Sequence, residues 1–307
     1  MEILKFNPIF KPTLWGSETW AVSAVKGSES VVLSGECKGM TLPEIVAEFG
    51  ADFLGKNNFE KFGHDFPLLI KFIDARQDLS IQVHPDDELS AKQHGKMGKN
   101  EMWYVVNADR GSQLIAGFRR EINVADYAQK VADGSIEEDL NKVNVSEGDC
   151  FYIPAGRVHG IGAGMVIAEI QQTSDVTYRI YDYLRRDRQG NLRELHTELA
   201  LDAINFKDVT IDPKVTYEEH RDTVISLVES PFFTTNELKL TRAITRHYGE
   251  QDSFHVYMCL WGQCCFLSPG GQGIFLKEGE SLVVPASMIE VTIIPDEGVK
   301  LLESYVG

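Results

Sequence analysis

The chain has 307 residues, of which 43% are hydrophobic. This proportion is enough to build a packed core and argues against a disordered chain. Its 30 Lys and Arg residues are outnumbered by 46 Asp and Glu residues, which gives a formal net charge of −16. So acidic a chain repels nucleic-acid phosphates and anionic lipid, and we therefore expect neither nucleic acid nor a membrane as a partner.

The N-terminal segment, MEILKFNPIFKPTLWG, has no long apolar run and no small-residue cleavage site, so it is not expected to be a secretory signal. No stretch of the sequence approaches the roughly 18 consecutive apolar residues of a membrane span. The cysteines are odd in number and lack the spacing of a zinc ribbon, which is typical of reduced thiols: Cys37, Cys150, Cys259, Cys264 and Cys265. These features together predict a cytoplasmic protein.

Short runs rich in Val, Ile, Phe and Tyr, bounded by Gly, Pro, Asp and Ser, predict strands along the whole chain. In chain order they cover residues 68–73, 102–107, 150–153, 165–170, 177–181, 238–245, 254–260, 274–276, 281–284 and 290–294. Helices are predicted over residues 41–49, 86–94, 123–132 and 197–205. The first opens with the capping box Thr41-Leu-Pro-Glu44, and a second capping box, Ser135-x-x-Glu138, follows the third. Many short strands with few helices favour a sandwich or barrel.

An internal repeat indicates how the chain is organised. One segment runs from Gly148 through Pro154 to His159, and another from Gly279 through Pro285 to Glu290, each with an apolar strand before Pro-Ala. Corresponding positions are 131 residues apart throughout (148 and 279, 154 and 285, 159 and 290). Either the chain contains two related barrels, or two β-hairpins resemble each other by chance. The first interpretation predicts one domain over residues 1–206 and a second over residues 207–307.

Three widely separated positions predict a catalytic metal site. In the run Ile-Gln-Val-His-Pro at 81–85, the alternation of a strand places Gln82 and His84 on one face. Glu101 opens the next predicted strand, and His159 follows a Pro-Ala-Gly turn. Two imidazoles and one carboxylate are a common ligand set for a catalytic divalent ion, because they leave positions for water or substrate. Each histidine alone would more often be structural; the combination is what predicts the site.

The pattern Gly148-x5-Pro154-x-Gly156-x2-His159 resembles the second motif of the cupin superfamily over its whole length. Gln82-x-His84 resembles the first motif with glutamine in place of its first histidine, and Glu101 stands for that motif's glutamate after a longer insertion. The resemblance implies a mainly β fold of two cupin-type (jelly-roll) β-barrels with a few inserted helices. In the second repeat the motif's glycine and histidine are replaced, so the second barrel is expected to hold no metal.

Within the cupins, the chain resembles the type I mannose-6-phosphate isomerases, in particular their short bacterial form. The resemblance covers most of the chain. It is carried by Leu-Trp-Gly at 14–16 with Trp20 and Ser23, LIKFID at 69–74, LSIQVHPDD at 79–87, GKNEMWY at 98–104, the cupin turn ending at His159, and EIQQTSDVTYRIYD at 169–182. The segment between Trp15 and Trp20 is shorter than in many relatives.

This resemblance implies a zinc enzyme, with one Zn²⁺ per chain, that interconverts mannose 6-phosphate and fructose 6-phosphate through an enediol. Gln82, His84, Glu101 and His159 match the zinc ligands of the family. The partner it implies is a small phosphorylated sugar, and the protein is expected to be a monomer or a homodimer.

The resemblance also implies roles for residues around the metal. Arg179 matches the family's active-site arginine, and a guanidinium suits an enediol because the oxygens of the enediol become more negative in the transition state. Lys99 matches a lysine near the substrate that would bind phosphate or assist proton transfer, and Asp175 matches an acidic group that would help ring opening. Ser80 is a candidate phosphate hydroxyl. As alternatives, Lys99 is a solvated loop lysine, and Arg179 forms an ion pair with Asp175 or Asp182.

Two other functions are compatible with the same residues. Two histidines and a carboxylate are also the facial triad of non-haem iron oxygenases. A degenerate second barrel is equally compatible with a non-catalytic sugar-phosphate sensor, since fold does not determine function.

Overall fold

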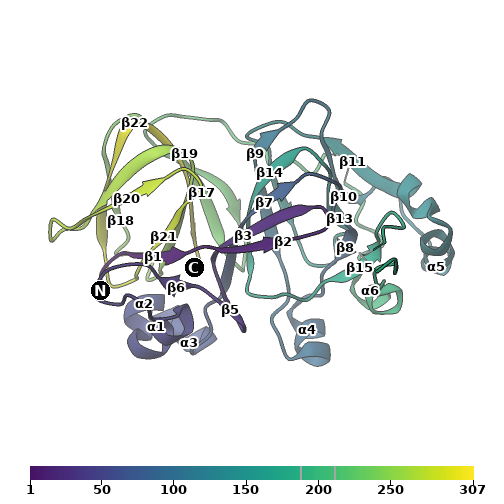
Figure 1. Ribbon diagram of the computed structural model, residues 1–307, viewed down its shortest axis with the longest axis horizontal. Coiled ribbons are helices and arrows are strands. Elements are labelled where there is room, and N and C mark those ends of the chain that lie inside the picture. The colour runs from purple at the N-terminus through teal and green to yellow at the C-terminus, as the bar shows by residue number, and fades with distance from the viewer. Residues whose placement is uncertain (187–188, 211) are drawn as a thin grey trace. The chain divides into compact units, whose positions relative to one another are not determined.

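The computed structural model describes residues 1–186, 189–210 and 212–307, and its fold is mainly β (Figure 1). The chain falls into two compact units. Unit 1 comprises residues 1–10, 19–71 and 216–307, and unit 2 comprises residues 11–18 and 72–215. Each unit is therefore assembled from segments that are distant in the sequence.

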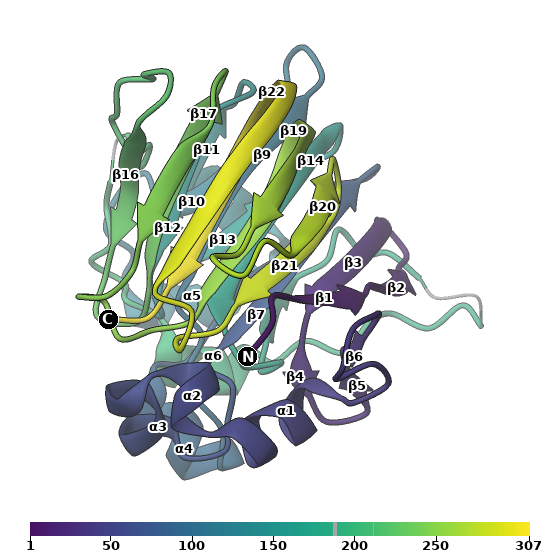
Figure 2. The same ribbon diagram turned by 90° about the vertical axis from the view of Figure 1, so that its left-hand side faces the viewer.

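Unit 1 is built on a nine-stranded sheet, most of whose strands run side by side in Figure 2. The path of the sheet is β16 (Val224–Glu229), β17 (Thr234–Leu240), β22 (Glu290–Tyr305), β19 (His255–Leu267), β21 (Ser281–Val284), β1 (Leu4–Asn7) and β6 (Val31–Val32). In addition, β18 (Ile244–His247) pairs with β22, and β20 (Gly273–Lys277) pairs with β19. A small hairpin, β4 (Ala24–Val25) with β5 (Ser28–Glu29), and the helices α1 (Leu42–Phe49), α2 (Ala51–Leu54) and α3 (Lys56–Phe62) complete the unit.

Unit 2 contains two sheets. The five-stranded sheet has the order β11 (Leu140–Asn144), β10 (Gln113–Phe118), β13 (His159–Ile161), β8 (Ile81–Val83) and β15 (Tyr178–Tyr181). The six-stranded sheet has the order β12 (Cys150–Ile153), β9 (Glu101–Ala108), β14 (Met165–Gln172), β7 (Leu68–Ala75), β3 (Gly16–Val22) and β2 (Ile9–Pro12), and the chain passes between the units within β2, β3 and β7. The helices are α4 (Asp87–His94), α5 (Val124–Asp133), the 3-10 helix η1 (Ser135–Asp139) and α6 (Thr197–Ala203).

The two sheets of unit 2 face each other across a shared apolar core. Trp103, Phe151 and Ile167 of the six-stranded sheet pack in one cluster with Leu114 and Ile161 of the five-stranded sheet. Burying these side chains between two sheets is the main stabilising contribution expected for such a layered architecture. Among the described residues neither sheet closes on itself, so unit 2 is formed by open sheets packed face to face.

The predicted elements agree with the structure over most of the chain. The strands 150–153 and 281–284 have the predicted bounds, and the four predicted helices coincide with α1, α4, α5 and α6 to within a few residues. The prediction of one strand over 238–245 was wrong, because the chain turns between β17 and β18. There Asp222 accepts hydrogen bonds from the backbone N–H groups of Thr241 and Arg242, at 2.6 and 3.2 Å, which draws them away from the ladder. The strands β10, β11, β13 and β16 were not predicted, nor were the short strands and helices before residue 68 apart from α1.

The two predicted capping boxes have different outcomes. At α1 the box is confirmed, because Glu44 N–H donates to Thr41 Oγ1 at 3.4 Å and Thr41 N–H donates to Glu44 Oε2 at 2.7 Å. The second box was wrong. Ser135 does not cap a helix; its backbone N–H donates to Asp133 Oδ1 at 2.9 Å, and it opens the 3-10 helix η1 directly after Gly134. Only Gly134 separates α5 from η1, and its backbone has the left-handed conformation.

The predicted division after residue 206 differs from the two compact units. Residues 1–10 and 19–71 group with the C-terminal strands, since β1 pairs with β21 through Leu4 and Val283, while residues 207–215 group with unit 2. The two domains over residues 1–206 and 207–307 remain a prediction. The five cysteines are free thiols. Within the described part of the chain, no helix is long and apolar enough to cross a membrane.

Candidate metal centre

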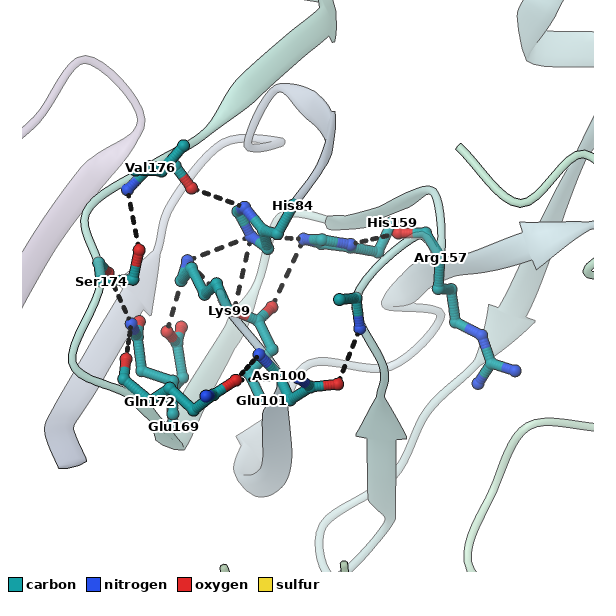
Figure 3. Close-up of polar contacts among 12 residues, drawn as sticks. His84, Lys99, Asn100, Glu101, Arg157, His159, Glu169, Gln172, Ser174 and Val176 are labelled. Carbon is teal, nitrogen blue, oxygen red and sulfur yellow. Dashed lines mark hydrogen bonds and ion pairs between the residues drawn. The ribbon is translucent and has the colours of Figure 1, made fainter. Parts of the chain in front are cut away.

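Three side chains from three different segments of unit 2 converge on one buried point. His84 directly follows β8, Glu101 is the first residue of β9, and His159 is the first residue of β13. One ligand atom from each lies within 4.8 Å of the others, and all three residues are buried (Figure 3). The structure therefore brings together the imidazoles and the carboxylate that the sequence predicted to form a metal site.

Backbone carbonyl groups determine which nitrogen of each imidazole carries a proton. His84 Nδ1 lies 3.0 Å from the carbonyl oxygen of Val176, and His159 Nδ1 lies 2.8 Å from that of Arg157. A carbonyl oxygen only accepts, so both Nδ1 atoms must donate. Both Nε2 atoms are then lone-pair acceptors, and they lie 3.1 Å apart. This is the arrangement by which an outer hydrogen bond orients a metal-ligating histidine.

Four acceptor atoms meet at this point, two imidazole nitrogens and two carboxylate oxygens. Glu101 Oε1 is 3.3 Å from His159 Nε2, and Glu101 Oε2 is 3.5 Å from His84 Nε2. Glu101 Oε2 is buried, and its ion-pair partner is Lys99 Nζ, 3.1 Å away. Burial lowers the pKa of His159 to about 3, so its imidazole is neutral at physiological pH. Two neutral nitrogen acceptors and a carboxylate fit a divalent cation such as zinc.

Lys99 supplies a positive charge beside the cluster. Its Nζ lies 3.0 Å from His84 Nε2 and 3.1 Å from Glu101 Oε2. The residue is 5% exposed, so the alternative of a solvated loop lysine is wrong. A buried ammonium this close to the predicted metal ligands can reach a molecule that binds at the same centre.

Gln82 and Ser80 lie on the strand that leads to His84. Gln82 of β8 is directly opposite His159 of β13 on one side and opposite Arg179 of β15 on the other. Directly opposed residues of antiparallel strands project to the same face of the sheet, so these three side chains share a face. Ser80 is buried and lies two residues before Gln82, which gives it the same orientation along an extended chain.

Arg179 lies on β15 with its backbone held by His196. The backbone N–H of Arg179 donates to His196 Nδ1 at 3.0 Å, and the backbone N–H of His196 donates to the carbonyl oxygen of Arg179 at 2.7 Å. Its Nη1 donates to the carbonyl oxygen of Glu194 at 2.8 Å, while its buried Nε has no acceptor among the described residues. Burial, together with nearby Arg193, lowers the pKa of Arg179. A partly buried guanidinium with an unused donor is suited to an anionic ligand.

The alternative prediction pairs Arg179 with Asp175 or Asp182, but both carboxylates form ion pairs with other residues. Asp182 forms ion pairs with Arg185 and Arg193. Asp175 pairs with Lys96 at 2.5 Å, and its side chain is 42% exposed. The alternative of an ion pair between Arg179 and either carboxylate is therefore wrong. Asp175 lies between β14 and β15 and belongs to no part of the buried cluster.

Glu169 is a site residue that the sequence reasoning did not assign. It lies on β14, is 4% exposed, and places its Oε1 4.0 Å from Lys99 Nζ. A glutamate inside a run of buried strand residues is a signal that could have identified it, because a buried carboxylate needs a positive partner. Lys99 therefore lies between two buried carboxylates, those of Glu101 and Glu169.

Comparisons with known proteins agree on one family. Residues 7–116 match the family model described as the catalytic domain of type I phosphomannose isomerase. The chain is 33% identical over 308 residues to "Mannose-6-phosphate isomerase ManA" of Bacillus subtilis, covering 94% of this chain and 95% of that protein. It is 35% identical over 279 residues to the mannose-6-phosphate isomerase of Streptococcus mutans, covering 89% and 84% of the two chains. The crystal structure of the mannose 6-phosphate isomerase from Bacillus subtilis superimposes with a TM-score of 0.88 at 28% identity, over 100% of both chains.

Proposed function

The chain belongs to the type I mannose-6-phosphate isomerases, and we propose on this premise that it is a zinc-dependent enzyme that interconverts mannose 6-phosphate and fructose 6-phosphate. The observation that carries the zinc dependence is the buried convergence of His84, Glu101 and His159, whose ligand atoms lie within 4.8 Å of one another. That two imidazole nitrogens and a carboxylate meet so closely supports a bound cation at this point.

The zinc ligands in this proposal are His84, Glu101 and His159, with Gln82 as a fourth. When bound, the ion would act as a Lewis acid that polarises a sugar oxygen. The orientation of both imidazoles by backbone carbonyls supports the assignment, since it leaves both Nε2 lone pairs directed at the same point. The side chain of Gln82 is assigned here because it shares a sheet face with His159.

The proposed chemistry is an aldose–ketose exchange through an enediol. A C–H bond at C2 of the aldose breaks, a C–H bond at C1 forms, and the C2 hydroxyl proton moves to the C1 oxygen, so no oxidant is consumed. The enediol oxygens are more negative in the transition state than in either sugar. The unused Nε donor of Arg179 supports a role in stabilising that charge, and the buried ammonium of Lys99 supports either phosphate binding or proton transfer.

Two further residues complete the proposed site. Ser80, which is buried just before β8, is proposed to donate its hydroxyl to the phosphate. Asp175 is proposed to assist ring opening, which requires its carboxylate to exchange Lys96 for the substrate. The surface position of that ion pair supports such an exchange, because exposed pairs contribute little to stability.

On the same premise we make proposals about the fold, the cellular location and the assembly of the protein. We propose that the chain forms two cupin-type jelly rolls, of which only the one that contains His159 holds a metal. The free thiols of all five cysteines support a cytoplasmic location. A monomer or homodimer is proposed as the working assembly.

A coupled isomerase assay over several sugar phosphates, with and without a chelator, tests the function. We expect turnover of mannose 6-phosphate that the chelator abolishes and that zinc restores. Bound iron with oxygen uptake would instead support an oxygenase. Absence of turnover in a zinc-loaded preparation contradicts the proposal.

The Arg179→Ala variant separates an enzyme from a sensor. We expect a loss of about 10²–10³-fold in kcat, the usual effect of removing one transition-state donor, with ligand binding retained. Arg242→Ala is the control, because Arg242 is an exposed arginine of unit 1 and should leave kcat unchanged. An Arg179→Ala enzyme with normal kcat would remove Arg179 from the mechanism.

A further inference from the structure

The segments that carry His84, Glu101 and His159 are joined at one turn, between β12 and β13. The backbone N–H of Gly156 donates to the carbonyl oxygen of His84 at 2.9 Å. The neighbouring N–H of Ala155 donates to Asn100 Oδ1 at 2.9 Å. The same turn continues into His159. A single turn of backbone is therefore hydrogen-bonded to both of the other segments that form the cluster.

Hydrogen bonds determine the orientation of the Asn100 carboxamide (Figure 3). Gln172 Nε2 donates to Asp87 Oδ1 at 3.0 Å, and a carboxylate only accepts, so Gln172 Oε1 must face the other way. That oxygen accepts from both the backbone N–H and Nδ2 of Asn100, at 2.9 and 2.8 Å. Asn100 Oδ1 is thereby left as the acceptor for Ala155. The direction of every bond follows from the carboxylate, and a flipped amide would leave buried groups unpaired.

Because of the place of Asn100 in the chain, its hydrogen bond with Ala155 affects the positions of two site residues. Asn100 is 3% exposed, lies between Lys99 and Glu101, and directly precedes β9. Successive side chains of an extended chain point to opposite sides, so Lys99 and Glu101 reach the cluster while Asn100 reaches the turn. A shift of Asn100 relative to the turn would move both functional side chains away from His159.

We propose that Asn100 is a positioning residue for the metal centre. Its carboxamide sets the separation between Glu101 and His159 by linking β9 to the turn that carries the histidine. Asn100 touches neither the ion nor the sugar and acts through Ala155 and Gln172. The inference rests on the proposed function, because it assumes that the cluster holds a divalent ion.

The test measures metal affinity directly, by competition with a chromogenic zinc chelator. Asn100→Ala removes the acceptor for Ala155 and the side-chain donor to Gln172, and we expect zinc affinity to fall by about 10–100-fold, as for other outer-shell substitutions. At saturating zinc, kcat should fall. Asn100→Asp retains an acceptor for Ala155 but opposes a carboxylate oxygen to Gln172 Oε1, so an intermediate affinity is expected.

Asn58→Ala is a matched control in unit 1. Asn58 is also buried, 4% exposed, and its Nδ2 donates to Leu54 O, Ser253 Oγ and Val306 O at 3.0–3.1 Å. Its loss should reduce the free energy of unfolding as much as the loss of Asn100, without changing zinc affinity. If zinc affinity fell only because the folded protein is less stable, it would fall in both variants.

The outcomes are distinct. Equal zinc affinity in Asn100→Ala and Asn58→Ala overturns the positioning role, and if Asn100→Ala does not fold, unchanged affinity in Asn100→Asp overturns it. Failure of the parent protein to bind any divalent ion overturns the proposed function instead. Weaker zinc binding in the Asn100 variants alone, with the graded order Asp then Ala, supports the inference.

Discussion

Burial determines the charge of the His159 imidazole. With its pKa lowered to about 3 by desolvation, the folded protein keeps this group neutral over the range in which an exposed histidine would become protonated. Neutrality is the condition for ligating a metal, because a protonated nitrogen has no lone pair. The carbonyl oxygen of Arg157 then holds the remaining proton on Nδ1.

The same pKa predicts how stability depends on pH in metal-free protein. The unfolded chain binds a proton at His159 below its ordinary pKa of 6.5, whereas the folded chain does not until about 3, so stability falls as the pH falls through this window. At pH 5 the loss due to this group should be about 2 kcal/mol. Urea unfolding in the presence of chelator measures it. The His159→Gln variant should lose less stability between pH 7 and pH 5 than the parent, and equal losses would contradict the prediction.

At the scale of elements, the turn between β12 and β13 depends on a left-handed glycine. Gly156 has φ +86°, and a Cβ there would lie 3.1 Å from the carbonyl oxygen of Ala203. Gly111 offers a comparison in the same unit, since it has φ +89° but an added Cβ there would meet nothing within 4 Å. The two positions separate the cost of the backbone conformation from the cost of displacing the turn.

We expect Gly111→Ala to reduce the free energy of unfolding by about 1–2 kcal/mol, the cost of a side chain in the left-handed region. Gly156→Ala should cost more, and it alone should weaken zinc binding, because the turn would move away from Ala203 and alter the hydrogen bonds to His84 and Asn100. Urea unfolding and the chelator competition measure the two effects. Normal zinc affinity in Gly156→Ala would show that the turn does not set the geometry of the cluster.

At the scale of the whole molecule, strand register relates the centres of the two units. Glu101 pairs with Ile153, and His255 pairs with Val284, which lies 131 residues after Ile153, so His255 has the register position of Glu101. Glu303 has the register position of Glu169 in the same way. Each pairs with a strand residue whose partner on its other side lies at the corresponding position of the two repeats. The matched register supports the two-repeat interpretation over chance resemblance.

The centre of unit 1 contains its own positive charge. Arg246 Nη2 donates to both carboxylate oxygens of Glu303, at 3.0 and 2.8 Å, and Tyr257 donates to the same carboxylate at 2.5 Å. Burial alone would raise the pKa of Glu303, but His255, Arg246 and Tyr257 together lower it to about 2. Glu290 stands at the repeat position that corresponds to His159. Its side chain is 43% exposed and pairs with His247 at 3.0 Å. A carboxylate already neutralised by a guanidinium does not need a metal ion.

We therefore expect one zinc per chain, held in unit 2. Metal analysis after dialysis should give one equivalent for the parent protein and for Glu303→Gln, and none for Glu101→Gln, although both substitutions replace a buried carboxylate with an isosteric amide. Glu303→Gln should reduce stability instead, because it leaves the guanidinium of Arg246 without its charged partner. Two equivalents in the parent, or the loss of metal in Glu303→Gln, would contradict the expectation.

The sequence by itself determined what depends on neighbours along the chain. Strand alternation and turn residues identified strands such as 150–153 and 281–284, the constant spacing of 131 residues identified the repeat, and motif spacing identified His84, Glu101 and His159. Only the tertiary structure decided which strands lie side by side. The pairing of β1 with β21, the approach of Glu169 to Lys99, and the bond between Asn100 and Ala155 each join residues whose local sequences carry no signal for one another. Local patterns record which face a residue occupies, whereas the partner across that face depends on the packing of the whole chain.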